Sequence, residues 1–214
     1  MGYFLWDFIH CRDYLQHQNQ HQCLEKLKSY KIILASGSPR RQQFFKELDI
    51  DFEIRLKEVE EIYPPHFQAE EITNYLAELK ANAFEGELKS DEIVVTSDTI
   101  VWHNNQCLGK PKDENDAFTM LKSLSNSTHE VITSVCFKTN TTTETFHEIT
   151  KVTFQELTDE AIRYYLTNYK PFDKAGSYAI QEWIGYIGIS KIEGSYTNVV
   201  GMPMHLVYQK LMNL

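Results

Sequence analysis

The residues best suited to chemistry begin in the segment 34–41, Leu-Ala-Ser-Gly-Ser-Pro-Arg-Arg, which follows a short apolar run. The pattern predicts a buried strand, a tight turn and then a helix, with Ser38 at the N-cap and Pro39 at the first helical position. A helix N-terminus offers free N–H donors and the positive end of the helix dipole. Arg40 and Arg41 in the first turn therefore indicate an anion site. The alternative is two solvated arginines beside an ordinary N-cap.

A second group of candidates surrounds Asp98, which lies in the β-branched run 93–101. That run predicts a central strand, where an aspartate needs a partner or a function. The alternative is a turn or cap residue after a shorter strand. Lys110 alone would be an ordinary surface lysine, but it follows soon enough to face the same cleft as Asp98. Lys80 lies at the edge of the apolar stripe of an amphipathic helix, where it either extends to water or meets an anion.

Two further clusters have metal-ligand chemistry. The acidic cluster at residues 58–61 lies beside a turn, and such clusters are more often solvated faces than metal sites. His17 and His21 have the i, i+4 spacing of ligands on one helix face, yet only Cys23 accompanies them. For that tract we favour a surface helix or an irregular leader over a metal site.

Length and composition limit the class of protein. A chain of 214 residues holds one sizeable core, or two lobes that share a sheet. The net charge of −9 and the absence of long basic runs argue against nucleic acid and anionic membranes as partners. An acidic protein with local cations suits a small polyanion bound with a divalent metal.

The four scattered cysteines argue against zinc and a disulfide framework, and they favour a reducing, cytoplasmic compartment. The apolar start of the chain is too short to cross a bilayer.

The elements that must position these residues alternate between strands and helices. The segment 129–154 is expected to form an antiparallel hairpin that is polar on one face. The small residues of 173–181 allow close backbone approach. We expect one α/β domain with a mixed sheet. The expected strands are 32–34, 51–56, 93–101, the hairpin 129–154 and 188–192, and the expected helices are 39–48, 72–83, 113–124, 159–168 and 204–214.

Six motifs together resemble the Maf family of nucleoside triphosphate pyrophosphatases. They lie, in order, at 34–41, 76–81, 97–99, 108–111, 173–181 and 193–203. The resemblance implies an elongated mixed β-sheet flanked by helices, with a central cleft, as in the inosine triphosphate pyrophosphatases. It implies a homodimer, with residues 31–214 as the catalytic domain and residues 1–30 as an extension outside the family pattern.

The resemblance also implies an activity, which is hydrolysis of a nucleoside triphosphate to the monophosphate and pyrophosphate with Mg²⁺ or Mn²⁺. Attack on the α-phosphorus requires a carboxylate that orients or deprotonates water, and cations that neutralise the developing charge. The metal would bridge carboxylates and phosphate oxygens. The implied catalytic residues are Asp98 as proton acceptor, Lys80 and Lys110; Ser36 and Arg41 join the two lysines in holding phosphates, and Glu61 with Asp98 binds metal. The family motif usually reads Asp-Glu where this chain has Glu60-Glu61, so Glu60 is the alternative ligand.

Substrate choice follows from three positions of the same motifs. Arg40, Thr99 and Gln181 resemble the dTTP/UTP pyrophosphatase branch, whereas the 7-methyl-GTP branch has tryptophan at the first position, where it can stack on a cationic purine. Gln181 can both donate to and accept from a pyrimidine edge. Two alternatives stay open: a pyrophosphatase for 7-methyl-GTP or other modified nucleotides, and a non-catalytic nucleotide-binding regulator of cell division or septum formation.

Overall fold

The computed structural model describes residues 27–214, and a seven-stranded mixed sheet runs through it. The strand order is β2-β1-β3-β5-β6-β7, and β4 pairs with β3. β1 is parallel to β2 and β3, and every other strand pair among the described residues is antiparallel. The strands are β1 (Lys31–Leu34), β2 (Glu53–Ile54), β3 (Glu92–His103), β4 (Gln106–Leu108), β5 (Thr128–Lys138), β6 (Thr143–Phe154) and β7 (Ile189–Glu193).

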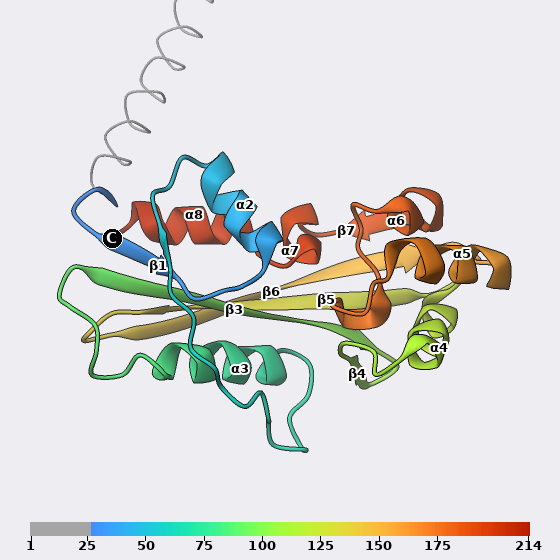
Figure 1. Cartoon of the computed structure of the whole chain (residues 1–214), viewed down its shortest axis with the longest axis horizontal. Helices are drawn as coiled ribbons and strands as arrows, with labels where there is room; N and C mark the ends of the chain where they lie inside the picture. The colour runs from blue at the N-terminus through green and yellow to red at the C-terminus, as the bar shows by residue number, and fades with distance from the viewer. Residues whose placement is uncertain (1–26) are drawn as a thin grey trace, which may run out of the picture.

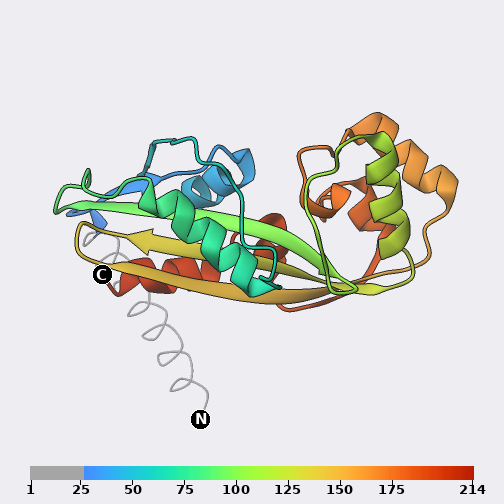
Figure 2. The same ribbon diagram turned by 90° about the horizontal axis from the view of Figure 1, so that it is seen from below.

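Helices cover both faces of the sheet and one end of it. In Figure 1, α3 lies against one face, α2, α7 and α8 lie on the other, and α4, α5 and α6 gather at one end of the elongated molecule. Figure 2 shows these groups as two lobes that share the long strands. The helices are α2 (Pro39–Glu47), α3 (Glu70–Asn82), α4 (Glu114–Leu124), α5 (Asp159–Tyr169), α6 (Trp183–Gly188), α7 (Tyr196–Val200) and α8 (Met204–Met212), with a 3₁₀ turn η1 (Ala175–Ser177).

The hydrophobic core is divided in the same way as the lobes. One cluster, with Leu121 and Tyr165, joins α4, α5 and α6 to the sheet, and another, with Phe45 and Val207, lies under α2 and α8. A third cluster, with Ile72, packs α3 on the middle strands. β3 and β5 both supply side chains to all three clusters, so these two strands connect the two lobes.

Most of the predicted elements are confirmed, with differences that packing explains. The pattern at 51–56 yields only the two-residue strand β2 at the sheet edge. The hairpin is not polar on one face throughout, because β5 is a central strand and is buried along nearly its whole length. β6, which pairs with β7 only over residues 151–154, keeps the expected alternation over much of its length. The short elements β4, α6 and α7 were not predicted.

Asp98 lies within β3, and its Cα pairs with that of Ser134 in β5. The alternative that placed Asp98 in a turn after a shorter strand is therefore wrong. The prediction for His17 and His21 lies outside the described residues. Within residues 27–214, no helix is both long enough and apolar enough to cross a bilayer.

Candidate active site

A cleft of about 1140 Å³ opens beside the middle of β3 and is lined by both lobes. All of the candidate residues from the sequence line it, namely Ser36, Arg40, Arg41, Glu61, Lys80, Asp98, Thr99, Lys110 and Gln181. Segments far apart in the chain thus supply four cationic side chains, two carboxylates and three neutral polar groups to one hollow. The structure brings these residues together, and the roles assigned to them stay predictions.

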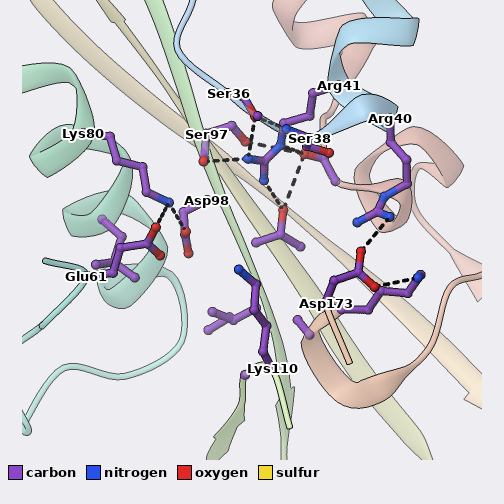
Figure 3. Close-up of a pocket in the computed structure, with 18 of the residues that line it drawn as sticks. Ser36, Ser38, Arg40, Arg41, Glu61, Lys80, Ser97, Asp98, Lys110 and Asp173 are labelled. Atoms are coloured by element: carbon purple, nitrogen blue, oxygen red, sulfur yellow. Dashed lines mark hydrogen bonds and ion pairs between the residues drawn. The ribbon is translucent and has the colours of Figure 1, made fainter. Parts of the chain in front are cut away.

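Lys80 lies between two carboxylates (Figure 3). Its Nζ is 2.6 Å from Asp98 Oδ1 and 3.2 Å from Glu61 Oε1. The side chains of Lys80 and Asp98 are 17% and 11% exposed, and that of Glu61 is 50% exposed. Thr96 ties α3 to β3 by donating from Oγ1 to the carbonyl of Ala77 at 2.6 Å. Lys80 therefore meets an anion, as one of the two sequence-based alternatives held, rather than extending to water.

Arg41 leaves α2 and is fixed by groups from three other segments. Its Nε donates to the Gly201 carbonyl at 2.8 Å, Nη1 to the Ser97 carbonyl at 2.9 Å and Nη2 to Thr99 Oγ1 at 3.1 Å. A longer contact of 3.4 Å joins Nη1 to Ser36 Oγ. Burial lowers the pKa of Arg41, an effect that the charge of nearby Asp98 partly offsets. The solvated alternative is wrong for Arg41, whose guanidinium is held rigidly at the cleft wall.

Arg40, which precedes Arg41 in α2, faces the opposite lobe (Figure 3). Its Nη1 is 3.7 Å from Asp173 Oδ2, and Asp173 Oδ1 in turn accepts from Lys174 Nζ at 2.8 Å. Lys174 is also 3.4 Å from Glu182. The pair Arg40–Asp173 crosses the cleft, and sequence reasoning did not identify Asp173 or Lys174 as site residues. Both lie inside the motif 173–181, which was the only available signal.

Lys110 points into the cleft and makes no hydrogen bond or ion pair with any residue of the described range 27–214 (Figure 3). Its loop is tied to η1, because Gly176 N donates to the Gly109 carbonyl at 3.0 Å. Gly176 has φ +65°, and a Cβ there would lie 2.8 Å from a methyl group of Val101. Only glycine therefore allows η1 to approach β3 this closely and hold the loop that carries Lys110.

Gln181 lines the cleft, and its buried Oε1 has no hydrogen-bond partner in the described chain. The segment before it is anchored: Tyr178 OH is 2.7 Å from His129 Nε2, and Ala179 N donates to Tyr165 OH at 3.2 Å. Burial lowers the pKa of His129 to about 3, so this contact is made by a neutral imidazole.

Two of the carboxylates that line the cleft, those of Glu61 and Asp98, suit a divalent cation. Glu61 and Asp98 converge on one positive charge, the amine of Lys80, and Glu61 lines the cleft whereas Glu60 does not. No group of three or more His, Cys, Asp or Glu side chains forms a metal site within residues 27–214. Mg²⁺ usually takes one or two carboxylates and completes its shell with water and substrate phosphates. This donor set therefore fits a metal that binds together with a polyphosphate, and it favours Glu61 over Glu60.

Comparisons with known proteins agree with the geometry. A family model described as Maf-like protein matches residues 31–214. A dTTP/UTP pyrophosphatase from Flavobacterium johnsoniae is 71% identical over 190 residues, which cover 89% of this chain and 98% of that protein. A dTTP/UTP pyrophosphatase from Phocaeicola vulgatus is 50% identical over 192 residues, covering 89% of this chain and 100% of that protein.

Among solved structures, the Ham1 protein of Staphylococcus aureus aligns with a TM-score of 0.50 at 16% identity, over 86% of this chain and 98% of that one. At this identity the likeness concerns the fold alone. It confirms the expected class, an elongated mixed sheet flanked by helices as in the inosine triphosphate pyrophosphatases.

Proposed function

The chain belongs to the Maf family, and on that basis we propose that it hydrolyses dTTP and UTP to the nucleoside monophosphate and pyrophosphate. The observation that carries the proposal is the position of Asp98, a strand-borne carboxylate in a cleft lined by Arg40, Arg41, Lys80 and Lys110. A triphosphate needs several cations, and its hydrolysis needs a carboxylate beside the attacked phosphorus. The cellular role that we propose is removal of non-standard or modified nucleotides.

Asp98 has one oxygen engaged and one available. Oδ1 accepts from Lys80, while Oδ2 has no hydrogen-bond partner among the described residues. In the proposed reaction Oδ2 orients a water and accepts its proton as the water attacks the α-phosphorus. Lys80 holds the carboxylate in place and lies beside the phosphate whose charge increases in the transition state.

The remaining cations differ in how free they are to bind phosphate. Lys110, without a protein partner in residues 27–214, is available to the pyrophosphate leaving group. Arg41 already donates to two carbonyls and two hydroxyls, so it offers a fixed charge with little reorganisation. Ser36 lies next to Arg41 in the same wall. Glu61 and Asp98 would hold Mg²⁺ or Mn²⁺, which when bound supplies further neutralisation of phosphate oxygens.

We assign base recognition to Arg40, Thr99 and Gln181, which all line the cleft. The unpaired Oε1 of Gln181 suits the N3–H of uracil or thymine, because cytosine carries an acceptor at that ring position. Arg40 is engaged with Asp173 and offers no aromatic face, which argues against 7-methyl-GTP.

We also propose a homodimer in a reducing, cytoplasmic compartment, with residues 31–214 as the catalytic domain and no nucleic acid or membrane partner. The thiols of Cys107 and Cys136 are free, and the net charge of −9 disfavours polyanionic surfaces. Exposed aromatic side chains such as Tyr186 and Tyr196 are compatible with an interface between copies. Light scattering during size-exclusion chromatography tests the dimer.

The test of the activity is a nucleotide panel with Mg²⁺, followed for pyrophosphate and for orthophosphate. We expect pyrophosphate from dTTP and UTP. Asp98→Asn should lower kcat by about 10³-fold or more while nucleotide binding persists. The control is Asp159→Asn, which alters an exposed aspartate on α5 and should leave kcat unchanged. Nucleotide binding without turnover by the wild type would favour the non-catalytic regulator, and unaltered turnover by Asp98→Asn would remove Asp98 from the mechanism.

A further inference from the structure

A row of hydroxyl groups behind the cleft wall connects Arg41 to α7. Arg41 Nη2 is 3.1 Å from Thr99 Oγ1, which is 2.9 Å from Thr133 Oγ1. Thr133 Oγ1 is 3.0 Å from the carbonyl of Asn198. Thr99 and Thr133 face each other across the β3–β5 ladder. Thr133 is fully buried and does not line the cleft, so it reaches the site through its two hydrogen-bond partners, Thr99 and the Asn198 carbonyl.

The groups at the two ends of this row favour one direction for its hydrogen bonds. A guanidinium only donates and a carbonyl only accepts. When Thr133 gives its single proton to the Asn198 carbonyl, which also accepts from Gly201 N at 3.0 Å, the bond between the two threonines is donated by Thr99. The competing acceptor for Thr99, the Gly201 carbonyl, is more distant at 3.4 Å and already accepts from Arg41 Nε at 2.8 Å. The proton of Thr99 thus points away from the cleft.

With its proton turned away, Thr99 faces the cleft as a hydrogen-bond acceptor and not as a donor. One of its lone pairs takes the Arg41 proton, and the other remains for a ligand. Gln181 also lines the cleft, and its buried Oε1 is a second acceptor that has no partner within residues 27–214. A base with an N–H at its pairing edge satisfies such a site, whereas a base with a bare ring nitrogen there would leave two acceptors facing each other.

We propose that Thr133 is a positioning residue that fixes the proton of Thr99 and thereby selects uracil and thymine nucleotides over cytosine nucleotides. The proposal rests on the proposed function, since it concerns the preference of that same cleft. It adds a residue outside the cleft, and it states which hydrogen-bond polarity the site presents to the base.

The test removes one hydroxyl without changing the shape of the strand. Thr133→Val keeps the branched side chain and frees the Thr99 proton to turn into the cleft. We expect the ratio of kcat/KM for dTTP to that for CTP to fall about fivefold, mainly through a gain with CTP. Thr133→Ser restores the hydroxyl and should restore the ratio.

Thr150→Val is the matched control. Thr150 is equally buried, and its hydroxyl also contacts Asn198, at 2.8 Å from Nδ2, but it does not reach Thr99. We expect a lower melting temperature for this variant and an unchanged dTTP-to-CTP ratio. A ratio that is unchanged in Thr133→Val, or that falls equally in Thr150→Val, would overturn the positioning role.

Equilibrium binding separates this inference from the activity on which it rests. α,β-Imido-dUTP and α,β-imido-dCTP report the base preference without turnover. If the wild type prefers the uracil analogue and Thr133→Val loses that preference, the positioning role holds even where no pyrophosphate is released, and only the proposed function fails. Equal binding of the two analogues by the wild type would overturn the inference.

Discussion

Replacing Lys80 with methionine should both destabilise the protein and remove its activity. Methionine has a similar length and keeps the apolar contacts of the α3 stripe, but it leaves Asp98 without its cation. The Asp98 side chain is about nine-tenths buried, so its carboxylate has little water to replace the lost partner. Glu61 is half-exposed and tolerates the loss.

The size of the effect follows from that difference in burial. Breaking a buried ion pair by removing one partner costs about 3–5 kcal/mol, and an exposed pair contributes about 0–1 kcal/mol. Since the cleft is open to water on one side, we expect about 2–3 kcal/mol for Lys80→Met, which corresponds to about 5–10 °C in melting temperature for a protein of this size. Loss of one charge aimed at the reacting phosphate should lower kcat by about 10²–10³-fold.

Urea denaturation followed by tryptophan fluorescence measures the stability, and pyrophosphate release measures the activity. Lys122→Met is the matched control, because Lys122 and Asp159 form a 2.7 Å pair whose members are both about half-exposed. It should destabilise the protein much less than Lys80→Met and keep full activity. The double variant Lys80→Met/Asp98→Asn removes the unpaired carboxylate, so it should be more stable than Lys80→Met alone while remaining inactive.

Two results would refute this reasoning. Equal destabilisation by Lys80→Met and Lys122→Met would mean that the cleft does not strengthen the Lys80–Asp98 pair. A double variant less stable than Lys80→Met would mean that Asp98 is not left uncompensated when the lysine is removed.

Two further predictions concern the segment beside Gln181. The pKa of His129 is about 3 in the folded protein against about 6.5 when unfolded, so the unfolded state binds the extra proton and stability falls as pH drops below 6.5. His129→Gln keeps a partner for Tyr178 and should reduce the slope of unfolding free energy against pH by about 1.4 kcal/mol per unit between pH 6 and 4; an unchanged slope would contradict the buried neutral imidazole. Gly176→Ala combines a positive φ with a Cβ only 2.8 Å from Val101, and it should destabilise the protein by at least about 1 kcal/mol more than Gly86→Ala, where φ is +75° but the space is open. Equal losses in chemical denaturation would mean that η1 is not closely packed on β3.

The long elements were predictable from the sequence because each repeats one pattern over many residues. The stripe from Ile72 onward identified α3, and the β-branched run around Asp98 identified β3. The helices α6 and α7 have six and five residues, too few for an apolar period to appear. The burial of β5 on both faces depends on α3, which comes earlier in the chain, and on α7, which comes later, so no local pattern in β5 predicts it.

The side chains of the site were also predictable, but not what holds them. Arg41 is fixed by the backbone carbonyls of Ser97 and Gly201. Every residue has a backbone carbonyl, so the residue types do not show which of them a side chain will contact. The pair Arg40–Asp173 joins positions far apart in the sequence and requires both lobes to be in place. The motifs therefore indicated which residues gather, whereas the hydrogen-bond directions needed the three-dimensional structure.

The position of bond cleavage tests the central claim most directly. Hydrolysis of dTTP in ¹⁸O-enriched water, with Mg²⁺ present and both products analysed by mass spectrometry, reports which phosphorus the water attacks. We predict one ¹⁸O atom in the nucleoside monophosphate and none in the pyrophosphate. Label in the pyrophosphate, or release of orthophosphate in its place, would contradict attack at the α-phosphorus beside Asp98.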